Sequence, residues 1–161
     1  MKINKTIILL SLLALQVVTS SCNNTKRTTT AAFYNFEIQY IREGMQGDIQ
    51  VKVFAEGHDE AECKTQAKYE AVKTLIFKGI TGSPSPQPIV TEVGAEEKYK
   101  QYFSNFFSQG GKYLNYVSLS KDGAVSKNDI LKVGNRLKIG VQVVVQKENL
   151  LLELKRNGII Q

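Results

Sequence analysis

The longest run of alternating apolar and polar residues lies near the end of the chain, and it limits the possible folds most narrowly. Every second residue from Leu137 to Val145 is aliphatic, and Lys138 and Gln142 stand between them. Side chains of a strand point alternately to its two faces, so the pattern predicts one buried face and one mostly hydrated face. We expect the whole segment from Leu131 to Gln146 to be a strand of an antiparallel sheet.

Two shorter segments in the first half of the chain predict a hairpin. Phe33 to Tyr40 alternates with a period of two, and Asp48 to Phe54 alternates again. The segment from Gly44 to Gly47, which lies between them, is typical of a turn.

A helix is predicted from Asp59 to Lys78. Asp59 and Glu62 have the spacing of a capping pair, in which each side chain satisfies a free amide of the first turn. Gly79 follows as the left-handed residue that commonly ends a helix. Mostly small side chains recur at four-residue intervals along the expected buried side: Cys63, Ala67, Ala71 and Leu75. Such a stripe lets a helix lie close to a sheet.

The segment from Gly79 to Gly94 is the least regular part of the chain. Pro84, Pro86 and Pro88 exclude both a helix and a central strand there. The next segment, Ala95 to Gln109, predicts a helix with an aromatic apolar side: Tyr99, Phe103, Phe106 and Phe107.

The remaining elements complete the predicted fold. Tyr113 to Leu119 predicts a strand, Lys121 to Gly123 a turn, and Glu148 to Asn157 a last helix. The order is then ββα–loop–αββα. We therefore predict an α+β fold, a two-layer domain in which helices pack on one face of an antiparallel sheet.

The first 22 residues have a different character. Lys2 and Lys5 precede an apolar run from Ile7 to Val18, then small polar residues and Cys22. This order is typical of a secretory signal peptide, and the run is shorter than the roughly 20 residues of a membrane span. Small residues directly before a cysteine resemble the lipobox of bacterial lipoproteins. The resemblance implies cleavage before Cys22 and acylation of its thiol and new amine; the alternative is an ordinary secreted protein with a free thiol.

These features divide the chain into three parts: a signal peptide (1–21), the lipidated Cys22 with a polar tether (22–32), and one periplasmic domain (33–161). Asn23 and Asn24 are not the aspartate that the lipoprotein family associates with inner-membrane retention. The resemblance thus implies a lipid anchor in the outer membrane, with the domain on its periplasmic face. Without residues 1–21 the net charge is (21 − 2) − 15 = +4, spread along the chain, which does not favour nucleic acid.

A second resemblance concerns the first part of the domain. The strand from Val51 to Gly57 and the alanine-rich helix from Ala61 to Ile76 resemble the N-terminal module of flagellar assembly protein T and related small envelope lipoproteins. Those proteins place a strand ending in glycine before an Ala-rich helix in a small α+β domain. The resemblance implies a role in envelope assembly.

The sequence offers no strong catalytic or metal-ligating pattern. His58 is the sole histidine, and Cys63 belongs to the stripe expected in the core. Zinc needs three or four ligands, more than these residues supply. Acidic pairs in first helical turns are favoured electrostatically without any catalytic role: Glu60 with Glu62 and Glu96 with Glu97. We therefore predict a protein that is not an enzyme and holds neither metal nor cofactor.

Two surface features suggest binding. Tyr102 falls off the aromatic stripe, and with Tyr113 and Tyr116 it is expected to form an exposed patch for an envelope protein. The proline segment is expected to add an extended contact. The predicted partner-binding residues are Pro84, Pro86, Pro88, Tyr102 and Tyr116. Binding of a small ligand or glycan is the alternative, which a concave pocket lined by tyrosines would favour over a flat patch.

Overall fold

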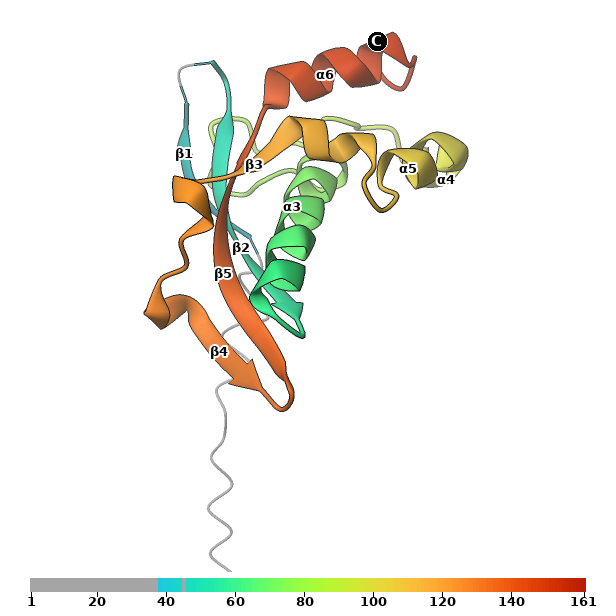
Figure 1. The fold of residues 1–161 in the computed structure, drawn as a ribbon. Coiled ribbons are helices and arrows are strands. Elements are labelled where there is room, and N and C mark those ends of the chain that lie inside the picture. Colours follow the sequence, from blue (N-terminus) through green and yellow to red (C-terminus); the bar gives the residue numbers. More distant parts are fainter. Residues whose placement is uncertain (1–37, 45) are drawn as a thin grey trace, which may run out of the picture. The chain divides into compact units, whose positions relative to one another are not determined.

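The computed structural model describes residues 38–44 and 46–161 (Figure 1). The predicted signal peptide, Cys22 and the polar tether lie outside the described residues. The strands are β1 (Ile38–Glu43), β2 (Ile49–Gly57), β3 (Val117–Leu119), β4 (Ile130–Val133) and β5 (Arg136–Val145). The helices are α3 (Glu60–Phe77), α4 (Ala95–Lys98), α5 (Lys100–Phe106) and α6 (Lys147–Arg156). Short 3₁₀ segments cover Lys112–Tyr116, Lys121–Gly123 and Lys127–Asp129.

The strands form one antiparallel sheet in the order β1-β2-β5-β3, with β4 also paired to β5. The central pair, β2 and β5, runs in register from Ile49 opposite Val145 to Gly57 opposite Leu137. Helix α3 crosses one face of this sheet (Figure 1). The predicted α+β fold with an antiparallel sheet is thus confirmed.

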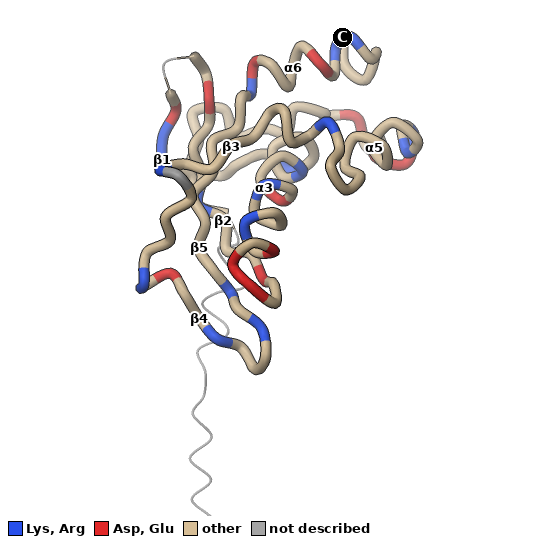
Figure 2. Tube along the Cα trace, in the orientation of Figure 1, with Lys and Arg blue, Asp and Glu red and all other residues tan. Residues whose placement is uncertain are grey.

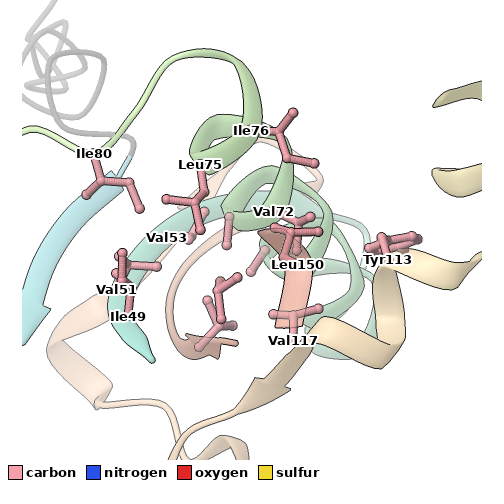
Figure 3. Close-up of a cluster of buried hydrophobic side chains, with 14 of the residues drawn as sticks. Ile49, Val51, Val53, Val72, Leu75, Ile76, Ile80, Tyr113, Val117 and Leu150 are labelled. Atoms are coloured by element: carbon pink, nitrogen blue, oxygen red, sulfur yellow. The ribbon is translucent and has the colours of Figure 1, made fainter. Parts of the chain in front are cut away.

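The core lies between this face and α3 (Figure 3). Val51 and Val53 of β2 and Val141 and Val143 of β5 are buried, as the alternation predicts. The small side chains of α3 meet them, and Leu150 and Leu154 of α6 close one end of the core. Close packing of this kind is what makes core substitutions costly.

The start of α3 follows the predicted capping pattern. Asp59 Oδ1 accepts a hydrogen bond from the amide of Glu62 at 2.8 Å. Glu62 Oε2 in turn accepts one from the amide of His58 at 2.6 Å, one residue before the usual partner. Two amides that the helix cannot satisfy itself are thereby paired.

Three expected elements differ in the structure. The predicted strand from Leu131 to Gln146 is a hairpin, because Gly134, with φ of 63°, turns the chain between β4 and β5. The predicted helix from Ala95 to Gln109 is broken at Tyr99, whose backbone leaves the helical region, and α5 ends at Phe106. Residues 112–116 form a 3₁₀ helix rather than a strand, because Tyr113 is buried against Tyr69.

The opposite face of the sheet is polar, as the alternation also predicts. Gln50 accepts a hydrogen bond from Arg42 Nε at 2.7 Å and donates one to Ser120 Oγ at 2.7 Å. Lys52 forms an ion pair with Asp129 at 2.8 Å. Ser120 and Asp129 lie in the segment between β3 and β4, so this segment shields the polar face.

Helices α4 and α5 pack against the side of α3 that faces away from the sheet. Phe107 lies 5.1 Å from Tyr69 and Phe103 lies 4.8 Å from Phe77, measured between ring centroids. We call the ring cluster in this region the aromatic layer: Tyr69, Phe77, Tyr102, Phe103, Phe106, Phe107, Tyr113 and Tyr116.

Among the described residues, no helix is long and apolar enough to cross a membrane.

Candidate functional site

The predicted partner-binding residues fall into two separate places. The three prolines lie in the segment after α3, whereas Tyr102 and Tyr116 lie in the aromatic layer. Across the described residues, no hydrogen bond, ion pair or ring contact joins these prolines to either tyrosine. The structure therefore presents two candidate sites, which we call the proline loop (residues 79–90) and the tyrosine cluster (Tyr102, Phe106, Tyr116 and Glu153).

The proline loop is held firmly at both flanks. On its first flank, Ile80 is buried in the core and its carbonyl oxygen accepts a hydrogen bond from Ser83 Oγ at 2.7 Å. On its second flank, the amides of Ile89 and Val90 donate to the carbonyl oxygens of Leu75 and Ile76 at the end of α3. Between these anchors Pro84 and Pro86 are exposed, and Pro88 is half-buried.

Gly79 explains why the loop can fold back so closely. Its φ is 76°, the left-handed conformation expected after a helix. A Cβ atom at this position would overlap the carbonyl oxygen of Pro86 and crowd the backbone of Gln87. The loop therefore lies directly on the end of α3.

Tyr102 and Tyr116 come together through Phe106. The Tyr102 ring stacks on Phe106 with a centroid distance of 5.6 Å, and the Tyr116 ring stacks on Phe106 at 6.0 Å. Both tyrosines are half-buried, and Tyr113 is only 4% exposed. The expectation that Tyr113 is exposed is thus wrong, because its ring packs against Tyr69 of α3, whereas partner binding by the half-buried Tyr102 and Tyr116 stays a prediction.

Glu153 of α6 is the charged member of the tyrosine cluster. Its side chain is only 12% exposed, Asn157 Nδ2 donates to its Oε1 at 3.1 Å, and Lys112 Nζ lies 3.5 Å away. Burial, followed by a hydrogen bond to Glu153, raises the pKa of Tyr116. Burial and then the Glu153 charge raise the pKa of Tyr102, whose hydroxyl is buried without a hydrogen-bond partner.

A cavity of about 420 Å³ lies beside this cluster. Tyr102 and Phe106 of α5 line it, together with Lys112 and with Asn157 at the end of α6. Glu153 and Asn157 were not among the predicted site residues. Their four-residue spacing places them on one face of the last helix, but the partners that they meet are remote in sequence.

The described residues include neither a metal-ligating cluster nor an exposed cysteine. Within residues 38–44 and 46–161, no group of three or more His, Cys, Asp or Glu residues could hold a metal ion. Cys63 lies in the core, where burial raises the pKa of its thiol and keeps it protonated. Both signs of charge are spread over the described chain, with acidic residues at the start of α3 and basic residues on the β4–β5 hairpin (Figure 2).

Comparisons with known proteins do not identify a family for this chain. No protein-family model matches it, and neither a curated protein nor a solved structure matches it. Its function must therefore be proposed from its own residues and their geometry.

Proposed function

We propose that this chain is a non-enzymatic lipoprotein of the cell envelope that binds a protein partner, with a role in envelope assembly. Its N-terminal pattern supports an anchor at Cys22 in the periplasmic face of the outer membrane. Several acyl chains would hold it there durably, because each buried methylene contributes about 0.8 kcal/mol. The α+β domain is the part that meets the partner.

The observation that carries the binding role is the fixed, exposed proline loop. Pro84 and Pro86 project from a segment whose two flanks are fastened to the core and to α3. A partner that binds such a segment has little backbone motion left to restrict, so the entropic cost of binding is low. Exposed proline segments are recognised in this way by protein partners.

Photo-crosslinking in living cells tests the partner. A probe at Gln87, which is exposed between Pro86 and Pro88, should give one discrete protein adduct. Replacing Pro84 and Pro86 by serine should remove that adduct. The matched control is Val93→Ser, which also removes an exposed apolar side chain but lies outside the loop. Absence of an adduct, or one that persists in the double variant, would count against the loop as a docking site.

Metabolic labelling with a fatty acid tests the anchor separately. The Cys22→Ala chain should carry no label and should accumulate as an uncleaved precursor. Label that persists in this variant would refute attachment at Cys22. Fractionation of labelled cells into inner and outer membranes then tests the proposed location.

A further inference from the structure

The cavity beside the tyrosine cluster has the form of a small-molecule site. Its volume of about 420 Å³ lies within the roughly 300–1,000 Å³ of typical ligand pockets. The Tyr102 ring supplies an apolar wall, backed by Phe106, which is only 2% exposed, and Asn105 and Asn157 supply amide groups. A wall of aromatic rings combined with a few polar groups is the usual composition of a site for a small polar ring.

Two adjacent glycines keep one wall of the cavity free of side chains. A Cβ atom at Gly111 would collide with the carbonyl oxygen of Phe106, so only glycine fits there. Gly110 adopts a φ of 72°, and no atom lies within 4 Å of the place where its Cβ would be. The chain thus passes closely behind α5 and leaves open space beside it.

Several polar groups at the cavity have hydrogen-bonding capacity left. The Tyr102 hydroxyl is buried and unpartnered, an arrangement that folded proteins generally avoid. The Asn105 side chain makes no hydrogen bond among the described residues. Asn157 uses its Nδ2 for Glu153 and retains its Oδ1 as an acceptor. The Tyr102 hydroxyl is covered in this conformation, so a ligand in the cavity reaches it only if the ring moves.

The cavity is lined mainly by neutral residues. Lys112 is the charged residue in the lining, and its ammonium lies 3.5 Å from the Glu153 carboxylate. The Tyr102 hydroxyl is neutral near pH 7, as tyrosine hydroxyls ordinarily are, so it can both donate and accept. Lys112 is 67% exposed and only loosely paired, whereas the other polar side chains of the lining are the neutral amides of Asn105 and Asn157 and the Tyr102 hydroxyl, a set that suits an uncharged ligand.

We propose that this cavity binds an uncharged sugar ring, with the C–H face of the sugar against the Tyr102 ring. Its hydroxyl groups would bond to Asn105, Asn157 and the Tyr102 hydroxyl. This binding site is separate from the proline loop, so either site can fail its test without affecting the other.

Nuclear magnetic resonance of the isotopically labelled full chain, in a detergent without sugar groups, tests this site. The probes are methyl β-glucoside and N-acetylglucosamine, with glucuronate as a charged sugar and benzyl alcohol as an apolar ring. At least one neutral sugar should shift the amides of Asn105, Gly110 and Gly111 with a Kd on the order of 1 mM. Shifts that are absent for both neutral sugars, that map elsewhere, or that are matched by benzyl alcohol or glucuronate would overturn the proposal.

Two variants separate binding from folding. Asn105→Ala, at an exposed position, should raise the Kd of the neutral sugar by about threefold or more, which is the usual effect of one lost hydrogen bond. Tyr102→Phe should raise this Kd by a similar factor. The variant should be at least as stable as the parent chain, because the lost hydroxyl has no hydrogen-bond partner in the protein. Tyr99→Phe, which removes a hydroxyl outside the cavity lining, is the control and should change neither property. Unchanged affinity in both test variants would refute the assignment.

Discussion

Helix α3 packs on two sides, and the two sides are built differently. The side toward the sheet carries Cys63, Ala67 and Ala71, each 0% exposed, and contacts the aliphatic residues of β2 and β5. The other side carries Tyr69 and Phe77, whose rings meet Phe107 and Phe103 edge-on. Small side chains let backbones approach closely, whereas edge-on rings keep their elements further apart.

The two sides also differ in the hollows that they leave at the surface. Two hollows lie along the aromatic layer, one of about 360 Å³ beside Tyr69 and Phe107 and one of about 420 Å³ beside Tyr102 and Phe106. Packing of small residues leaves few voids. The buried small residues therefore fix α3 on the sheet, and a further hollow of about 340 Å³ opens only where polar side chains of α3, such as Glu62 and Gln66, meet β2 and β5.

The largest expected effect comes from removing a ring of the aromatic layer. Phe103 is buried and contacts Phe77, Tyr102 and Phe107. Phe103→Ala should lower the free energy of unfolding by about 3–5 kcal/mol, measured by urea denaturation. Val93→Ala, at a residue that is 99% exposed, should change it by less than about 0.5 kcal/mol. A loss below about 1 kcal/mol for Phe103→Ala would mean that the aromatic layer contributes little to the core.

Added volume on the sheet side should have the next largest effect. Ala67→Leu forces three further carbon atoms between α3 and the sheet, so we expect a loss of about 1–3 kcal/mol in the same measurement. Ala61→Leu makes the same change at an exposed position of the same helix and should be nearly neutral. Equal effects of the two substitutions would contradict the tight packing described for this side.

Alkaline pH should weaken the aromatic layer selectively. Burial raises the pKa of Tyr102, Tyr113 and Tyr116 above the ordinary value near 10. The folded chain holds these protons more tightly than the unfolded chain, so their contribution is complete below about pH 10 and is lost as pH rises further. Tyr102→Phe should lose less stability than the parent chain between about pH 9 and 11. A parallel loss in both chains would show that Tyr102 titrates normally.

The smallest effect is expected from the ion pair that joins α3 to α4. Lys73 Nζ lies 2.8 Å from Glu96 Oε1, and the hydrogen bond between them raises the pKa of Lys73. Because both side chains are partly exposed, we expect a coupling of only about 0.2–1 kcal/mol in a double-mutant cycle of Lys73→Ala and Glu96→Ala. The coupling should shrink in high salt, and a value insensitive to salt would point to packing rather than charge.

The sheet side of the molecule could be predicted because local rules determine it. Alternation identified the buried face of β5, and the spacing of Asp59 and Glu62 identified the start of α3. The β4–β5 hairpin was missed although its signal is present, since Gly134 and Asn135 form a typical two-residue turn between apolar segments.

The aromatic layer could not be predicted in the same way. Tyr113 and Tyr116 suggested a strand because aromatic residues are frequent in strands, but that preference reflects packing and not the backbone. Their conformation follows from contacts with Tyr69 and Phe106, which lie elsewhere in the sequence. The same reason explains why Glu153 was not expected beside Tyr102.

The edge strands of the sheet are short or bulged, which affects how copies of this protein associate at high local concentration. On one border, the three-residue β3 and the four-residue β4 share the outer side of β5. On the other, the described part of β1 carries a bulge between Tyr40 and Arg42. Long, flat strand edges are templates for pairing with another chain, and short or bulged ones are poor templates. Copies of this domain held side by side should therefore resist edge-to-edge aggregation.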